Sequence, residues 1–168
     1  ELCLLPCDTT MVKIRRATKD DVPTILHLVR ELAIYEKEPN AVVATEADFI
    51  RDGFGDQPRF HVHLAESDGT IIGFALWFFT WSTWRGTRCL HLEDLFVLPE
   101  HRKKGAGLLL MKELARAAVD TGCARFIWQV LDWNEPSIEF YKRLGANVMN
   151  EWIAVRLEGA ALHRMDEK

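Results

Sequence analysis

The order of helix-like and strand-like segments predicts an α+β fold in which helices pack on one β-sheet. Three observations support this prediction. Apolar residues recur every three or four positions in some segments, they alternate or form short runs in others, and no repeat or linker separates the two kinds. A chain of 168 residues is also long enough for one domain to bury a core without disulfides or metal.

The first half of the chain opens with a strand and two helices. Residues 12–16 alternate apolar and polar side chains, as a half-buried strand does. Thr18 and Asp21 have the spacing of a capping box, so a helix is predicted to start there. Thr45 has the same role for a shorter helix, with the acidic Glu46 in its first turn.

Three strands are predicted next. Residues 60–66 and 71–79 flank an Asp68-Gly69 pair, which is a strong signal for a hairpin turn. Residues 89–98 are rich enough in apolar side chains to form a central strand.

The second half is predicted to add two helices and three strands, with a last antiparallel pair at the end. In chain order these are a helix, a strand, a helix and two strands, at residues 107–119, 125–131, 135–144, 150–157 and 160–165. The whole chain then has about seven strands and about four helices in one folding unit.

Composition narrows the classes of partner. The chain is 48% hydrophobic and 27% charged, and no apolar run approaches the roughly 18 residues of a membrane span. Its net charge of −4 and scattered basic residues disfavour nucleic acid. The four cysteines form no CxxC pair, which favours the cytoplasm. We interpret residues 1–10 as a disordered leader or cloning remnant, and residues 11–168 as a single domain.

The most informative segment lies between the predicted central strand and the helix at 107–119. Its glycines allow main-chain amides to converge on an anion, and the helix start adds unpaired amides and a positive dipole end. The segment therefore predicts a pyrophosphate-binding turn, although many glycine turns only bend the chain. Its residues are Arg102, Lys103, Lys104, Gly105, Ala106, Gly107 and Leu108.

Two other phosphate-binding motifs do not match this turn. A P-loop needs a lysine and a hydroxyl residue directly after the last glycine, but Gly107 is followed by Leu108 and Leu109. A dinucleotide fingerprint needs a third glycine and an early strand, and both are missing.

Two longer segments resemble the GNAT acetyltransferase superfamily. Residues 92–108 contain its R-x-x-G-x-G loop, and residues 133–146 resemble its N-x-x-[AS]-x-x-x-Y-x-x-x-G-[AF] segment. Four shorter stretches are similar to the diamine and thialysine acetyltransferases within that superfamily: residues 31–33, 35–37, 52–55 and 84–86. The similarity runs from about Val12 to Trp152.

The resemblance implies a GNAT fold, which has a central mixed, mostly antiparallel twisted sheet, and it implies acetyl-CoA as cosubstrate. It also implies a homodimer. The pantetheine arm is expected to pair with the central strand, and the pyrophosphate to sit at the glycine turn. The cofactor-binding residues so implied are Leu95, Phe96, Val97, Arg102, Lys103, Lys104, Gly105, Ala106, Gly107, Leu108, Asn134, Ser137, Tyr141 and Arg143.

Acetyl transfer to an amine needs a neutral nucleophile and help for the departing thiolate. Glu93 matches the family's glutamate and is expected to remove the ammonium proton, with Asp94 adding negative potential. Neighbours on a strand point to opposite faces, so both carboxylates reach one site only if the strand bulges there. Tyr141 matches the family's tyrosine; because a phenol is a weaker acid than a thiol, we expect it to hydrogen-bond the thiolate.

A small cationic amine is the expected substrate, because acidic and aromatic side chains recur at the matching positions. The expected substrate-binding residues are Glu36, Trp84, Glu93, Asp94, Glu151 and Trp152.

The chain departs from the polyamine enzymes in two places. No acidic residue stands between Trp81 and Trp84, which favours a shorter amine such as thialysine over a long polyamine. The spacing between Gly86 and Glu93 is one residue longer than the family pattern.

There are three alternative functions at this point. The first is metal binding by His61 and His63, which share a strand face; they lack a nearby carboxylate or cysteine set, so we predict no metal site. The enzyme could act instead on a protein lysine or an N-terminus. A non-catalytic acyl-CoA sensor is the third possibility, but a sensor needs neither Glu93 nor Tyr141.

Overall fold

The computed structural model describes residues 11–166, so the expected leader at residues 1–10 lies outside the described part. The chain divides into two compact units, the first ending at Gln129 and the second beginning at Val130. No helix between residues 11 and 166 has both the length and the apolar character needed to cross a membrane.

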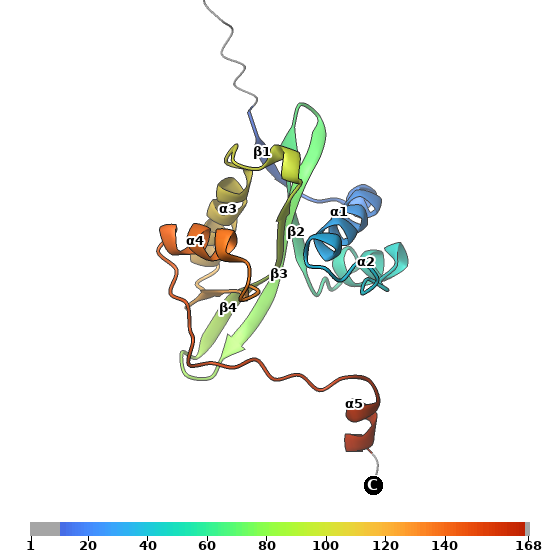
Figure 1. Ribbon diagram of the computed structural model, residues 1–168, viewed down its shortest axis with the longest axis vertical. Helices are drawn as coiled ribbons and strands as arrows, with labels where there is room; N and C mark the ends of the chain where they lie inside the picture. Colours follow the sequence, from blue (N-terminus) through green and yellow to red (C-terminus); the bar gives the residue numbers. More distant parts are fainter. Residues whose placement is uncertain (1–10, 167–168) are drawn as a thin grey trace, which may run out of the picture. The chain divides into compact units, whose positions relative to one another are not determined.

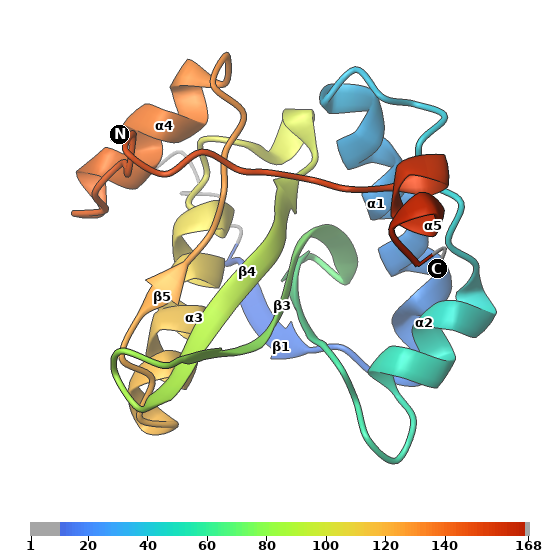
Figure 2. The ribbon, with the colours of Figure 1, turned by 90° about the horizontal axis from the view of Figure 1, so that it is seen from below.

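The first unit is built on one five-stranded sheet. Its strands lie side by side in chain order, and only the last pair is parallel, so the sheet is mixed and mostly antiparallel as expected. Figure 2 shows β5 at the edge next to β4. The strands are β1 (Lys13–Arg16), β2 (His61–Ser67), β3 (Thr70–Ser82), β4 (Thr87–Val97) and β5 (Phe126–Ile127).

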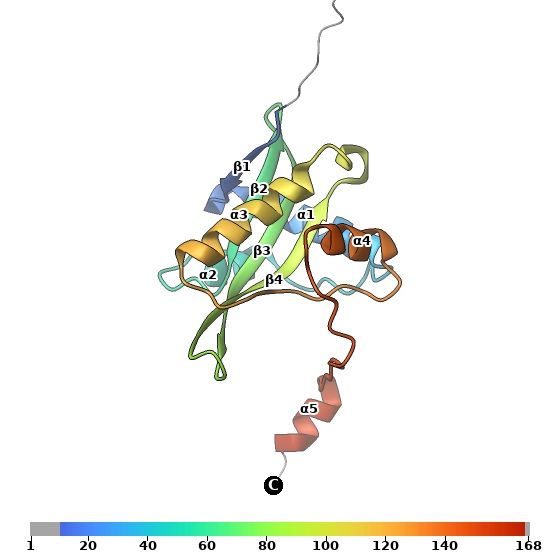
Figure 3. The same ribbon diagram turned by 90° about the vertical axis from the view of Figure 1, so that its left-hand side faces the viewer.

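Helices cover both faces of this sheet. Helices α1 (Val22–Tyr35) and α2 (Glu46–Gly53) lie on one side, and α3 (Ala106–Asp120) lies on the other (Figure 1). Figure 3 shows α3 running across its face of the sheet. The main hydrophobic core forms between α1, α2 and the sheet, and it consists of Val22, Ile25, Leu26, Leu28, Leu32, Phe49, Val62, Leu64, Phe74, Leu76 and Phe96.

Local signals place the first helices where they were predicted. Asp21 accepts from the Thr18 main-chain amide at 2.7 Å and caps a 3₁₀ turn, Lys19–Asp21, that leads into α1. Arg15 of β1 holds the same carboxylate through two contacts of 2.8 Å, which ties the strand to the helix start. Thr45 and Asp48 form the second capping box, at the start of α2.

The hairpin between β2 and β3 turns at Asp68-Gly69, as predicted. Both residues have positive φ, 51° and 75°, which is the signature of a type I′ turn. The β2–β3 register is therefore set largely by local chain geometry.

Strand β4 contains a β-bulge opposite Leu76 and Trp77 of β3. Trp77 of β3 lies opposite Leu92, and the next residue, Leu76, lies opposite Asp94. Glu93 is therefore an extra residue with no partner of its own on β3. The sheet thus meets the condition under which two neighbouring carboxylates can face the same side.

The end of the chain differs from prediction. The strand expected at 125–131 pairs only at Phe126–Ile127. The strand pair expected at 150–157 and 160–165 was wrong, because residues 151–158 are irregular and α5 (Gly159–Asp166) occupies the rest. With α4 (Glu135–Arg143), residues 11–166 contain five strands and five α-helices rather than seven and four.

These errors have a common physical reason. Alternating apolar residues make a strand only when a neighbouring strand supplies hydrogen bonds and covers one face. In this region the apolar side chains stay exposed, with Ile153 at 85% and Val155 at 93%. The Ala-Ala-Leu segment of α5, in contrast, has high intrinsic helix propensity.

Candidate active site

The bulge in β4 gathers acidic side chains on the sheet face that α1 covers. Asp94 shares this face with Leu76, which lies directly opposite it and belongs to the core packed on α1. Glu93 lies 3.5 Å from His91 Nε2 through its Oε2 atom. His91 in turn packs against the Phe78 ring on the same face, with the two rings tilted relative to each other. Without the extra residue, Asp94 would point to the opposite face.

Asp94 is the most strongly perturbed carboxyl of the cluster. Burial, together with the nearby negative charges of Glu93 and Glu36, raises its pKa to about 7. Within residues 11–166 no hydrogen bond or ion pair engages this carboxylate. It is therefore positioned to take up a proton or to meet a cation near neutral pH.

Glu36 approaches the same cluster from α1. It is the C-cap residue of that helix, and its main-chain amide donates to the carbonyl oxygen of Leu32 at 2.9 Å. Partial desolvation raises its pKa as well. Two elements far apart in sequence thus supply three carboxyl groups to one small region.

Beyond the bulge, one edge of β4 is not paired with another strand within residues 11–166. Leu98 donates its amide to the Ile72 carbonyl at 2.9 Å, so the alternate residues Val97 and Leu95 direct their N–H and C=O groups to the other edge. Strand β5 pairs with β4 only at Leu90 and His91, so it does not cover that stretch.

The three β4 residues expected to bind the cofactor therefore divide into two kinds. Leu95 and Val97 have main-chain groups on the open edge, whereas the Phe96 main chain faces β3 and its side chain is buried in the core. An extended ligand arm along this edge would pair with alternate residues, as an added strand does.

The glycine turn leads directly into the start of α3. Lys103 and Gly105 both have positive φ, 63° and 88°, and Gly105 is the N-cap of the helix. The first helical hydrogen bond runs from the Leu109 amide to the Gly105 carbonyl at 3.0 Å. The amides of Ala106, Gly107 and Leu108 precede that bond and point out of the helix end.

This turn combines open space with positive charge. A Cβ built on Gly105 would meet no atom within 4 Å, so the space over the helix end is open. Lys104 is exposed beside it. Free amides, the positive helix end and a cation in an open turn are the elements of an anion site.

Arg102, at the start of the turn, uses its side chain within the protein. Its Nε donates to the Val97 carbonyl at 2.8 Å. Its guanidinium carbon lies 4.5 Å from the ring centroid of Tyr35 and 5.4 Å from that of Phe96. The sequence pattern identified Arg102 as part of the loop but gave no sign of these contacts.

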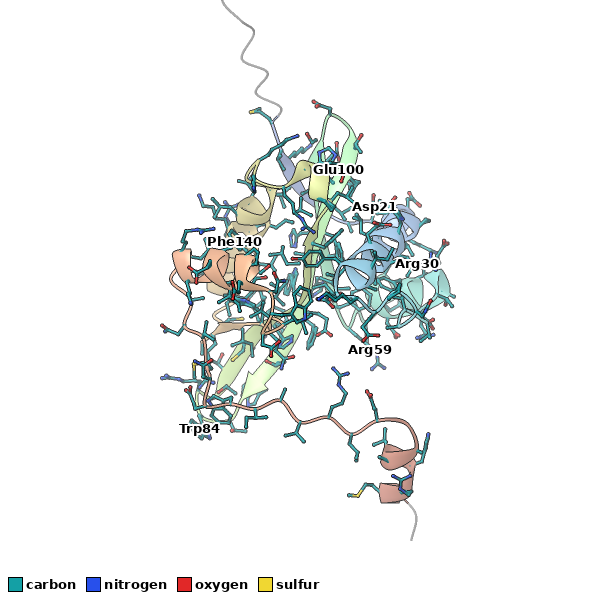
Figure 4. All side chains as sticks on the ribbon, viewed as in Figure 1. Asp21, Arg30, Arg59, Trp84, Glu100 and Phe140 are labelled. Atoms are coloured by element: carbon teal, nitrogen blue, oxygen red, sulfur yellow. The ribbon has the colours of Figure 1, made fainter. Side chains whose placement is uncertain are left out.

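Trp84, expected to contact substrate, lies in the turn of the β3–β4 hairpin and is 83% exposed. Figure 4 shows it at the far end of the β3–β4 hairpin from Glu100, which lies two residues before Arg102. The strand from Thr87 to Glu93 spans about 20 Å at roughly 3.3 Å per residue. The structure therefore does not bring Trp84 beside the acidic cluster.

The remaining expected site residues belong to the second unit. Tyr141 is buried in α4 and contacts the Phe140 ring, with centroids 5.4 Å apart. Asn134 is also buried, and its side chain caps α4 by accepting from the Ser137 amide at 3.4 Å. Arg143 lies exposed in the last turn of α4.

Glu151 and Trp152 of the second unit are both exposed and lie in irregular chain between α4 and α5. Their expected contact with substrate stays a prediction.

Two residues near the cluster were missed by the sequence reasoning. His91 is two positions before Glu93, and strand periodicity alone predicts that they share a face. Tyr35 directly precedes Glu36, but its contact with Arg102 crosses more than sixty positions and left no local signal.

His63, one of the two histidines on β2, makes a hydrogen bond within the first unit. His63 is buried, and its Nδ1 accepts from Trp77 Nε1–H at 3.0 Å. Desolvation lowers the pKa of His63 to about 4, so the ring is neutral at physiological pH. Residues 11–166 contain no group of three or more histidine, cysteine or acidic side chains that could hold a metal ion.

Known proteins are similar to this chain in sequence over most of its length. Thialysine N-epsilon-acetyltransferase of Sus scrofa is 39% identical over 168 residues, which cover 94% of this chain and 98% of that protein. The human spermidine/spermine N(1)-acetyltransferase-like protein 1 is 38% identical over 80% of this chain, although the match covers only 20% of that longer protein.

Solved structures show the same fold. An integron cassette protein from the mobile metagenome of V. cholerae has a TM-score of 0.79 and 28% identity, with 94% of this chain and 98% of that chain covered. An aminoglycoside N-acetyltransferase solved with CoA has a TM-score of 0.71 and 22% identity, covering 91% and 98%. The family model described as acetyltransferase (GNAT) matches residues 24–146. With the anion turn and the bulged central strand in place, the chain belongs to the GNAT acetyltransferase family.

Proposed function

We propose that this protein transfers an acetyl group from acetyl-CoA to the primary amine of a small cationic substrate by direct attack. The observation that carries this proposal is the bulge at Glu93. It turns two neighbouring carboxylates to one face of β4, on the strand whose open edge leads into an anion-binding turn.

Donor binding rests mainly on the main chain. The amides of Ala106, Gly107 and Leu108 are placed to hold the diphosphate, with Lys103 and Lys104 adding positive charge at the turn. Leu95 and Val97 offer edge groups to the pantetheine arm. Acetyl-CoA supplies the thioester; the protein supplies orientation and proton transfer.

Removal of a proton is the main chemical demand on the acceptor side. An alkylammonium has a pKa near ~10.4, so only about one molecule in a few thousand is a nucleophile at neutral pH. Glu93 is exposed enough to meet a substrate proton, and its side chain is 54% exposed beside His91. Asp94 and Glu36 make the surrounding potential negative, which attracts the cation.

The acceptor is inferred from the same charges. Three carboxyl groups, from Glu36, Glu93 and Asp94, favour a substrate with more than one cationic group. The curated relatives named thialysine N-epsilon-acetyltransferase match nearly the full chain, so thialysine is the first candidate and diamines or polyamines follow.

Four residues of the second unit complete the proposal. Tyr141 donates a hydrogen bond to the departing thiolate, and Ser137 and Arg143 contact the donor together with the helix cap at Asn134. Support for these roles comes from the GNAT motif at residues 133–146.

We also propose a homodimer in the cytoplasm that has neither nucleic acid nor membrane as a partner, with residues 11–168 acting as one domain. The net charge of −4 supports the exclusion of nucleic acid, and the absence of a CxxC pair from the sequence supports the compartment. Support for the homodimer comes from the resemblance to the GNAT family. Sedimentation equilibrium measures the oligomeric state directly.

An amine panel tests the proposed function. CoA thiol release from acetyl-CoA is measured with thialysine, ornithine, putrescine, spermidine, lysine and a lysine-containing peptide. We expect turnover with the small amines and little with the peptide. Glu93→Gln is expected to lower kcat/KM about 100-fold, within the range of general-base catalysis. Acetyl-CoA binding without turnover of any amine would refute the proposal.

A further inference from the structure

Arg102 opens the anion turn, and its cationic side chain is the obvious candidate to bind a phosphate. The structure gives that side chain another task, because it contacts Val97, Tyr35 and Phe96. It is partly buried, and it joins three elements of the first unit: α1, the end of β4 and the turn before α3.

The first contact closes the end of β4. The Val97 carbonyl lies on the open edge, where it has no strand partner within the described part of the first unit. Arg102 Nε donates to it at 2.8 Å. This bond uses one of the two lone pairs of the Val97 carbonyl, so Leu95 and the Val97 amide are the edge groups that meet no competing contact from Arg102.

The second contact reaches α1. The guanidinium lies over the ring of Tyr35, with Phe96 as a second aromatic neighbour, and Tyr35 and Phe96 are themselves 6.4 Å apart. Cations over aromatic rings at such distances attract them, more strongly when water is partly excluded. The residue that follows Tyr35 is Glu36, one of the three carboxyls of the acceptor cluster.

We propose that Arg102 is a positioning residue which binds no phosphate through its side chain, and which holds the anion turn, the edge of β4 and the Tyr35–Glu36 end of α1 in register. Loss of the guanidinium then disturbs both substrates: the donor through the turn and the β4 edge, and the amine through Glu36. This inference rests on the proposed acetyl transfer from acetyl-CoA.

Two acetyl donors distinguish positioning from phosphate binding. S-acetyl-pantetheine has the thioester arm of acetyl-CoA but none of its phosphates. For Arg102→Met we expect KM to rise about tenfold for both donors, with the ratio of the two KM values within twofold of wild type. We also expect the amine KM to rise several-fold. A rise at least tenfold larger for acetyl-CoA than for S-acetyl-pantetheine would overturn the proposal.

Lys104→Met is the matched control, because it removes a cation from the same turn without touching Tyr35 or Val97. We expect its KM for S-acetyl-pantetheine to stay within twofold of wild type. If this variant weakens S-acetyl-pantetheine as much as Arg102→Met does, any charge in the turn has the same effect and the specific role of Arg102 is wrong.

Tyr35→Leu approaches the same contact from α1 and is informative even if Arg102→Met does not fold. Tyr35→Leu should raise KM by the same factor for both donors. In the double variant of Tyr35→Leu and Arg102→Met, KM should be no more than about twofold above that of either single variant. If the KM increases of the two single variants multiply in the double variant, the Tyr35 ring and the guanidinium act independently, which contradicts the proposal. Arg102→Lys keeps a cation but lacks the planar guanidinium. Its KM for each donor should lie between the values of wild type and Arg102→Met.

Binding measurements separate this inference from the proposed function. If the wild type transfers acetyl to no amine, the proposed function fails, but calorimetric Kd values for CoA and pantetheine still test Arg102. Equal weakening of both ligands in Arg102→Met supports positioning. Weakening of CoA alone identifies a phosphate contact and refutes it.

Discussion

Replacing Asp94 with asparagine should stabilise the protein in neutral and alkaline solution. Burial and two neighbouring carboxylates raise the pKa of Asp94 from 3.8 to about 7 in the folded protein. A raised carboxyl pKa means that the folded state prefers the protonated form, so ionisation opposes folding. Asparagine has nearly the same shape and cannot ionise.

The pKa values give the magnitude and the pH window. A shift of about 3 units corresponds to roughly 4 kcal/mol, at about 1.36 kcal/mol per unit. Because Asp94 is only partly buried, solvent screening reduces this, and we expect about 1–3 kcal/mol. Below pH 3.8 both states are protonated and nothing is lost. The cost of Asp94 grows as pH rises from 3.8 to about 7, and it is complete above that.

Urea unfolding at pH 5 and pH 8 measures this effect. The free energy of unfolding of Asp94→Asn minus that of wild type should be larger at pH 8 than at pH 5 by about 0.5–2 kcal/mol, because part of the cost of Asp94 is already present at pH 5. Glu93→Gln removes one of the charges that raise the pKa of Asp94. The free energy of unfolding of this variant should therefore fall less between pH 5 and pH 8 than that of wild type. An Asp94→Asn advantage that is equal at both pH values contradicts the argument.

Three other substitutions test separate parts of the structure. Gly105→Ala forces a φ of 88° on an alanine, so we expect the free energy of unfolding in urea to fall by about 1–2 kcal/mol and the KM for acetyl-CoA to rise. If both values are unchanged, the assigned turn geometry is wrong. Arg15→Gln breaks the contacts to Asp21 and Glu66 and should cost about 1–3 kcal/mol of unfolding free energy at pH 7. Because Arg15 lowers the pKa of Asp21, this cost should vanish as the pH falls and Asp21 becomes protonated in the folded protein. A cost that does not change with pH refutes the pairing. Phe74→Ala should cost about 3–5 kcal/mol in the same assay, and a change under 1 kcal/mol is incompatible with its fully buried position.

Much of the first unit could be predicted from the sequence, because its signals are local. The capping boxes at Thr18 and Thr45 and the turn at Asp68-Gly69 each depend on a few adjacent residues, and all three are confirmed. The glycine turn before α3 is of the same kind, since Gly105 caps that helix with a left-handed conformation that favours glycine.

The sequence by itself determined the segments that carry chemistry and the turn that precedes α3. Only the tertiary structure decided where Glu93 and Asp94 face, because a bulge is a mismatch between two strands and neither strand encodes it alone. It likewise decided that Arg102 lies over Tyr35, and that residues 150–165 form no strand pair, since such contacts depend on which distant segments come together.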